Sequence, residues 1–358
     1  MKKSIVNLAE PIITIYSGYS NAISILLNYK YGVDWFIHNF LNIISVYDYK
    51  NNILLSDFMN MKNVFFASTR NFSPDNIFCP PIKSFSVPRQ YLSDNKINII
   101  DYIKYYLDNN YCCCFHVDNT YINYSNMNRI HDIFIYGYDD DSEFIYLSDN
   151  LYAGKYERVT CTYEELNKAY NSVAFDGAWD SKGIFNHFSS YEKLNFVKFD
   201  SNFIFSFDKK AFIDEMQIYI NKTEYDLNYT PKIIETTLNE VEIYYNVKIY
   251  DVLEKYILRS LESKKHIDHR QIFLLHDHKN ALNYKVKYLL DNGLIKNKDL
   301  LKTTKQLIKT TITLVNKVLK YNLNFENSKD RFEEYKILLR DVKSNELDVI
   351  NHIVEELS

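Results

Sequence analysis

The hydrophobic periodicity of the chain changes at about residue 206, and this change limits the folds open to it. Before that point the apolar residues occur in short runs separated by turn-forming residues, a pattern typical of strands and short helices. After it they recur every three or four positions almost to the end, as in helices that bury one face. The sequence therefore predicts an α+β domain over residues 1–205 and an all-helical domain over residues 206–358.

Composition supports two well-packed domains. A chain of 358 residues with 46% hydrophobic residues has ample apolar surface for two cores. It contains 7 Gly and 6 Pro, too few for low-complexity linkers or for a turn-dense β-sandwich. We therefore expect long helices and short connections.

Two stretches of the C-terminal half carry the clearest helical stripes. The first consists of Leu301, Thr304, Ile308, Thr311, Ile312, Val315, Val318 and Leu319. The second consists of Phe332, Tyr335, Leu339, Val342, Leu347, Ile350, Ile353, Val354 and Leu357. Such stripes are usually the inner faces of a helical bundle, so we expect core packing here and not docking surfaces.

Charge and hydropathy exclude several partners. The formal net charge is -4, so the chain has no global positive field to hold nucleic acid, and its tyrosines lack the basic groove that base stacking requires. The basic start of the chain is followed by Glu10 and Pro11 without an apolar run typical of a secretory signal. No apolar stretch approaches the roughly 18 residues of a membrane span. We expect a cytoplasmic protein with neither a nucleic-acid nor a membrane partner.

No cofactor or metal site is predicted. The chain has five cysteines, three of them consecutive at residues 112–114, and neighbours on a strand point to opposite faces, so we expect buried, reduced thiols. His266, His269, His276 and His278 lack a zinc-binding pattern and are interpreted as exposed or capping residues. The acidic turn at residues 139–141 lacks the ligand ladder of a calcium loop and is interpreted as solvated. A phosphate-binding glycine loop is also missing.

A first helix is expected to begin at or just after Gly18. Ala22, Ile25, Leu26 and Tyr29 repeat at helical spacing, and Gly32 is a suitable stop signal. Ser17 and Ser20 are interpreted as helix caps. Further helices are predicted from Asn98 to Leu107 and after Thr162, which forms a capping box with Glu165.

Three strands are expected in the middle of the N-terminal domain. Residues 111–118 read as a buried strand, because they are almost continuously apolar. Residues 130–138 and 144–150 flank the acidic turn and form the clearest hairpin in the chain.

The hairpin brings His131 close to Asp149 if it is symmetric about Asp141. Ile133 then faces Asp149, and His131 lies two residues along the same strand on the same face. The two residues become diagonal neighbours, within reach of an imidazole–carboxylate hydrogen bond. A slip of one residue would send Asp149 to the opposite face.

This pair suggests a site for nucleophilic catalysis that lacks its nucleophile. A carboxylate on one ring nitrogen orients the imidazole, and the other nitrogen exchanges a proton with a nucleophile. The start of a helix is a suitable place for that nucleophile, because the helix dipole lowers the pKa of a thiol and free N–H groups hold an oxyanion. The first turn after Gly18 is such a place, with the Gly18–Tyr19 turn as the oxyanion site, but Gly18 has no side chain.

Several segments resemble one family. Residues 16–24, residues 128–140 and residues 147–150 are similar to the N-terminal domain of the butirosin biosynthesis protein H family, which is papain-like (cysteine-peptidase-like) and related to bacteriocin leader peptidases. Residues 266–270 with His278 and Lys279 are similar to the helical region of stand-alone members found beside peptide and polyketide assembly lines. The resemblance covers most of the chain.

The resemblance implies acyl or aminoacyl transfer in nonribosomal peptide or polyketide biosynthesis. In the family a cysteine takes an acyl group from the thioester of an acyl or peptidyl carrier protein and passes it to an amine or to water. His131 matches the family's histidine, Asp149 its carboxylate, and Gly18 falls on its cysteine. Ile12 stands where papain-like proteases carry a glutamine that helps to bind the oxyanion.

The missing cysteine leaves several hypotheses open. The protein is either a pseudoenzyme that binds a carrier or a partner enzyme, or a disabled variant of a working acyltransferase, or an enzyme with a displaced nucleophile such as Ser17 or Ser20. A direct route, in which His131 activates water or an amine, is chemically reasonable. An interaction scaffold acting through the helical domain is a third class of function. The oligomeric state stays open, with a homo-oligomer as one option.

Overall fold

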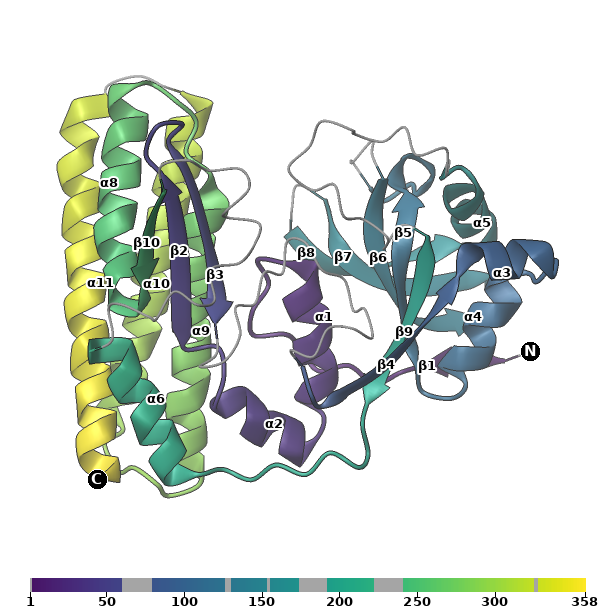
Figure 1. Cartoon of the computed structure of the whole chain (residues 1–358), viewed down its shortest axis with the longest axis horizontal. Coiled ribbons are helices and arrows are strands. Elements are labelled where there is room, and N and C mark those ends of the chain that lie inside the picture. Colours follow the sequence, from purple (N-terminus) through teal and green to yellow (C-terminus); the bar gives the residue numbers. More distant parts are fainter. Residues whose placement is uncertain are drawn as a thin grey trace. The chain divides into compact units, whose positions relative to one another are not determined.

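The chain forms two compact units, seen in a computed structural model (Figure 1). Unit 1 comprises Met1–Val33 and Phe66–Phe205, and unit 2 comprises Asp34–Phe65 and Ser206–Ser358. The structure describes residues 2–59, 79–125, 130–152, 155–173, 192–221, 241–324 and 328–358. The predicted α+β class is confirmed, with a large sheet in unit 1 and mainly helices in the C-terminal region.

The division differs from the predicted one at residues 34–65. The sequence predicts that this segment is part of the N-terminal domain, but it belongs to unit 2. The reason is strand pairing, because the hairpin formed by β2 (Asn42–Asp48) and β3 (Ile53–Met59) pairs through β2 with β10 (Val241–Tyr245). The other boundary, between residues 205 and 206, coincides with the predicted one.

Unit 1 is built on an antiparallel sheet. Its strands follow the order β4-β9-β5-β6-β7-β8, and β1 pairs with β6. The strands are β1 (Lys3–Ile5), β4 (Ile82–Pro88), β5 (Cys112–Asp118), β6 (Ile130–Asp139), β7 (Phe144–Tyr152), β8 (Lys155–Thr162) and β9 (Lys193–Phe199). The buried strand and the hairpin predicted from the sequence are therefore confirmed as neighbours in one sheet.

Helices cover both faces of this sheet (Figure 1). They are α1 (Ser17–Leu26), α3 (Arg89–Asp94), α4 (Ile99–Leu107) and α5 (Tyr163–Asn171), with a short 3-10 turn η1 (Asn119–Tyr121) after β5. Leu147 of β7 joins the core formed with α3, α4 and α5. Its neighbour Ser148 contacts Asn21 of α1. Because successive residues of a strand point to opposite faces, α1 packs on the face opposite to α3–α5.

Several local predictions are confirmed in unit 1. Asn98 caps α4, because its side chain accepts hydrogen bonds from the backbone amides of Ile100 and Asp101. Thr162 and Glu165 form the capping box of α5. The cysteines at residues 112–114 and Cys161 are buried and free, as expected for small apolar residues in a core.

The prediction of one helix from Gly18 to Gly32 was wrong. Helix α1 ends at Leu26, and a second helix, α2 (Lys30–Ile37), begins after a short turn. Gly32 lies inside α2 and does not stop a helix. A Cβ atom at Gly32 would lie 2.3 Å from the carbonyl oxygen of Leu26, so the close approach of the two helices requires glycine there.

The acidic turn of the hairpin is not simply solvated, and the interpretation based on the sequence was wrong for two of its residues. The carboxylate of Asp139 lies 2.9 Å from Nζ of Lys3, and that of Asp140 contacts Lys104. Asp141 is exposed. The turn is therefore held by β1 and α4, which fixes the outer end of the β6–β7 hairpin.

The prediction of an all-helical C-terminal domain was wrong, because β10 lies within residues 206–358 and unit 2 packs helices on a small sheet of order β10-β2-β3. Its helices are α6 (Lys209–Asn221), α8 (Ile249–Glu262), α9 (His269–Asp291), α10 (Asp299–Leu323) and α11 (Ser328–Leu357), with a 3-10 turn η3 (Asn246–Lys248) before α8. Among the helices that the structure describes, none combines the length and apolarity needed to cross a membrane.

The residues that α10 and α11 bury differ in part from the apolar stripes predicted for them. On α10 the buried residues are Leu300, Thr304, Leu307, Thr311, Leu314, Val315, Val318 and Tyr321. Leu319, predicted in the stripe, is 39% exposed. On α11 most of the predicted positions are buried, but the same face also buries the charged residue Glu346.

The prediction that the four histidines near residue 270 are exposed or capping was wrong for His278. This side chain is fully buried, and its Nε2 atom donates to the carbonyl of Leu41 at 2.6 Å. It lies beside a buried ion pair between Lys279 and Glu346. His266, in contrast, is exposed.

Candidate functional site

A β-bulge sets the register of the hairpin that carries the candidate site. Next to the turn Gly137 pairs with Tyr146, whereas farther along Ile135 pairs with Leu147. Tyr136 lies between the two paired positions of β6 and has no counterpart on β7. The two halves of the hairpin therefore differ in register by one residue.

The bulge moves the part of the hairpin away from the turn into the register that the sequence predicts. Beyond it Ile135 pairs with Leu147 and Phe134 pairs with Ser148. Asp149 follows Ser148 and pairs with Glu157 of β8. His131 and Asp149 therefore lie close together at the end of the hairpin away from the turn.

His131 and Asp149 are hydrogen-bonded. Nδ1 of His131 donates to Oδ2 of Asp149 at 2.7 Å and also lies 2.9 Å from the backbone oxygen of Asp132. The Asp149 side chain is 1% exposed and the His131 side chain 21%. The buried carboxylate thus fixes the orientation of the ring. Nδ1 donates its proton to this carboxylate, and Nε2 is available to a ligand.

Asp132 links this pair to the start of α1. One of its carboxylate oxygens lies 3.4 Å from Nδ1 of His131, and the other accepts a hydrogen bond from Oγ of Ser17 at 3.3 Å. Ser17 is the first residue of α1, and Gly18 follows it in the first turn. The structure therefore connects His131 and Asp149 to the first turn of α1 through a carboxylate that the sequence analysis did not assign to the site.

The start of α1 differs from the prediction in two respects. Tyr16 is the N-cap residue, whereas Ser17 lies inside the helix and Oγ of Ser20 donates back to the carbonyl of Ile13. The interpretation of both serines as caps was therefore wrong. The amide of Tyr19, predicted to hold an oxyanion, donates to the carbonyl of Tyr16 at 3.0 Å. The amides of Ser17 and Gly18, the first of the helix, are better suited to that role.

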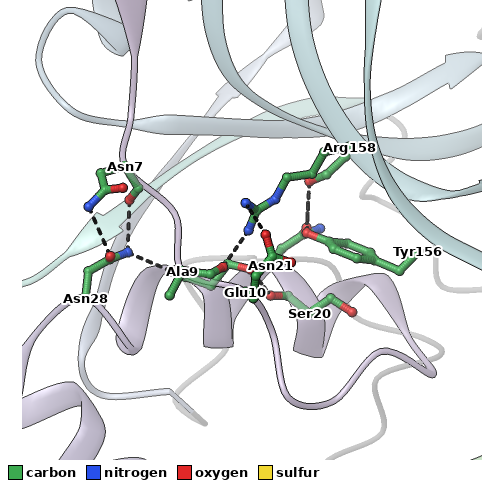
Figure 2. Close-up of polar contacts among 10 residues, drawn as sticks. Asn7, Ala9, Glu10, Ser20, Asn21, Asn28, Tyr156 and Arg158 are labelled. Carbon is green, nitrogen blue, oxygen red and sulfur yellow. Dashed lines mark hydrogen bonds and ion pairs between the residues drawn. The ribbon is translucent and has the colours of Figure 1, made fainter.

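A buried polar network anchors α1 to the sheet. Oδ1 of Asn21 accepts from Oγ of Ser148 at 3.2 Å and from the hydroxyl of Tyr156 at 3.0 Å. Arg158 of β8 contacts Glu10 and the carbonyl of Ala9 just ahead of the helix (Figure 2). These contacts hold α1 against β7 and β8 and so fix the position of its first turn.

The electrostatics of the site favour a charged imidazole. Burial of the His131 ring opposes its charge, but the carboxylates of Asp149 and Asp132 outweigh burial and raise the pKa of His131 to about 10. Burial raises the pKa of Asp149, and Asp132 adds to this effect, while His131 opposes it. At neutral pH the pair is therefore an imidazolium bound to a buried carboxylate.

Two further residues of β5 lie near the site and were missed by sequence reasoning. His116 pairs with Asp132 across the sheet and is 6% exposed. Burial lowers the pKa of His116 to about 4, so it is neutral. Burial, with Asp132 and Asp149, raises the pKa of the Cys114 thiol well above its usual value. Only the pairing of β5 with β6 brings these residues to the site, and the sequence carries no local signal of it.

His131, Asp132 and Asp149 also offer ligand atoms within 4.8 Å of one another, close enough to hold a metal ion. In zinc sites, bonds of about 2.0–2.2 Å keep neighbouring ligand atoms roughly 3 Å or more apart. Nδ1 of His131 and Oδ2 of Asp149 are 2.7 Å apart, a distance typical of a direct charge-assisted hydrogen bond. We therefore interpret the contact as a hydrogen bond, and the expectation that no metal binds stays a prediction.

No protein-family model matches this chain, and no curated protein matches it. The family implied by the sequence resemblance therefore stays a proposal.

The charge of His131 can be measured directly. We expect its ring protons, followed by NMR, to titrate with a midpoint well above 6.5, the usual pKa of histidine. Because the folded pKa of His131 is raised, the protonation of His131 contributes stability that is fully present below about pH 6.5 and is lost as pH rises toward 10. In Asp149→Asn the midpoint of the His131 titration should fall, because the ring stays buried, which opposes its charge, while the carboxylate that stabilised that charge is removed. A midpoint at or below 6.5 in the unmodified chain would contradict the imidazolium assignment.

Proposed function

We propose that unit 1 is a papain-like acyl-transfer domain that lacks its covalent nucleophile and binds the thioester of an acyl or peptidyl carrier protein. The observation that carries the proposal is the 2.7 Å hydrogen bond between His131 and Asp149. It lies beside the first turn of α1, where the resemblance expects a cysteine and the chain has Gly18. The pathway that the resemblance implies is nonribosomal peptide or polyketide biosynthesis.

Ser17, Ser20 and Cys114 are poor replacements for the missing thiol. Oγ of Ser17 donates to Asp132, and Oγ of Ser20 donates to backbone carbonyls. The thiol of Cys114 is buried, and its raised pKa keeps it protonated and unreactive. A displaced nucleophile is therefore not supported among these candidates.

A direct general-base route is also disfavoured. A base must be unprotonated to accept a proton from water or an amine. His131 is charged at neutral pH because its pKa is raised by two carboxylates. An imidazolium instead donates hydrogen bonds, which suits the carbonyl oxygen of a bound thioester. The present chain is therefore better suited to binding than to turnover.

Restoring the thiol tests the proposal. In Gly18→Cys the new thiolate should attack the carbonyl carbon of an acyl-pantetheine thioester. A thioester to the protein forms, the bond to the pantetheine sulfur breaks, and the released thiolate takes up a proton. We expect intact-mass measurement to show one acyl group per chain.

The unmodified chain is the matched control for the five native cysteines. It should remain unlabelled, since burial raises the pKa of Cys79 to about 12 and raises the pKa of each of the other four thiols above its usual value. A folded Gly18→Cys variant that stays unlabelled over a range of acyl donors would reject the acyl-transfer assignment.

A further inference from the structure

The site carries more negative than positive charge. His131 contributes one positive charge, whereas Asp149 and Asp132 are both carboxylates, and His116 is neutral. Among the described residues, no lysine or arginine pairs with Asp132. One negative charge is therefore left uncompensated beside the start of α1.

Asp132 is the carboxylate that a ligand can reach. Its side chain is 16% exposed, whereas that of Asp149 is 1% exposed. Its contacts with Ser17 at 3.3 Å and with His131 at 3.4 Å are both longer than an ideal charge-assisted hydrogen bond. Asp132 therefore keeps the capacity to accept a stronger hydrogen bond from a cationic donor.

We propose that the acyl group bound at this site is an aminoacyl group, whose ammonium is held by Asp132. This inference rests on the proposed function. His131 and Asp132 are adjacent in the chain, so a carbonyl near the imidazolium places an amine on the neighbouring carbon close to the Asp132 carboxylate. An acyl group with its own carboxylate in that place would be repelled.

Matched donors separate this specificity from general reactivity. Alanyl and isobutyryl thioesters of pantetheine have the same shape, but the alanyl group carries an ammonium where the isobutyryl group carries a methyl group. In Gly18→Cys we expect the alanyl donor to label the protein faster than the isobutyryl donor. In Gly18→Cys/Asp132→Asn we expect the ratio of the alanyl to the isobutyryl labelling rate to fall at least about 10-fold, because a hydrogen bond between charged groups is lost. Comparing the two ratios cancels the greater intrinsic reactivity of aminoacyl thioesters.

Two further variants control for structural effects. Asp132→Glu keeps the carboxylate and should restore part of the preference. Asp141→Asn changes an exposed carboxylate of the same hairpin and should leave the ratio unchanged. Circular dichroism would verify that each variant is folded.

The outcomes distinguish this inference from the proposed function. If Gly18→Cys takes up neither donor, nor any other acyl group, the proposed function fails. If it takes up both donors and the ratio is the same with and without Asp132→Asn, the site is an acyl site and only the aminoacyl inference is overturned.

Discussion

Replacing Glu346 by leucine is expected to destabilise unit 2 by about 3–5 kcal/mol, because it leaves a buried ammonium without its partner. Lys279 and Glu346 are both fully buried and form an ion pair. The second carboxylate oxygen of Glu346 accepts from the hydroxyls of Tyr219 at 3.0 Å and Tyr250 at 2.5 Å. The change would remove one charge and would leave the hydroxyls of Tyr219 on α6 and Tyr250 on α8 without this acceptor, while Lys279 on α9 would keep only its contact with Nδ1 of His278.

The double variant Lys279→Met/Glu346→Leu is the matched control. Removing both charges also removes the penalty of an unpaired ion, so most of the lost stability should return. Urea unfolding followed by the helical circular dichroism signal measures the free energies of unfolding. If Glu346→Leu is as stable as the unmodified chain, the ion pair does not hold the helices together as the structure indicates.

The contribution of the same ion pair to the stability of unit 2 depends on pH. Burial of Glu346 favours its neutral form, but Lys279 and His278 outweigh burial and hold the pKa of Glu346 far below its usual value. A carboxyl group with a lowered folded pKa stabilises the protein above its unfolded pKa, near 4.3, and this stabilisation is lost as pH falls. Unit 2 should therefore lose stability in acid, and Lys279→Met/Glu346→Leu should lose less.

Local patterns in the sequence were sufficient for much of unit 1. Two strand-like segments on either side of the acidic turn predicted the hairpin of β6 and β7, and the capping box of Thr162 and Glu165 predicted the start of α5. These signals depend on residues close together in the chain, and local chemistry determines them. The proximity of His131 and Asp149 followed from the hairpin.

The register of that hairpin was predicted correctly beyond the bulge and wrongly next to the turn. Symmetry about Asp141 would require the same register at the turn, but Gly137 pairs with Tyr146 there. The bulge at Tyr136 then shifts the pairing by one residue, so that Phe134 pairs with Ser148 as predicted. Bulges have weak sequence signals, so the position of Asp149 could not be derived securely from the turn.

Long-range packing accounts for what the sequence did not show. Residues 34–65 read as part of the first domain, yet β2 pairs with β10 about 200 residues away. His278 has the polar character of a surface residue, but it is buried beside the ion pair of Lys279 and Glu346. In the candidate site, His116 and Cys114 become neighbours of Asp132 only through pairing between β5 and β6.

Once a thiol is restored at position 18, His131→Ala should slow acylation by about 10²–10⁴-fold, the usual contribution of a general acid or base. The imidazole would pair with the new thiolate and lower its pKa, so its loss leaves a less reactive thiol. Asp149→Asn should act in the same direction, because the amide neither stabilises the imidazolium nor fixes the ring in the same way. The measurement is the rate of adduct formation in Gly18→Cys with and without each second change.

The pH profile separates a catalytic role from a structural one. In Gly18→Cys the imidazolium should keep the thiol reactive at neutral pH, whereas in Gly18→Cys/His131→Ala labelling should rise only as pH approaches 8.5, the ordinary thiol pKa. A second change that merely disturbed packing would lower the rate at every pH without moving the profile. If His131→Ala leaves both rate and profile unchanged while the fold is intact, the contact between His131 and Asp149 is structural, and the acyl-transfer site must be rejected.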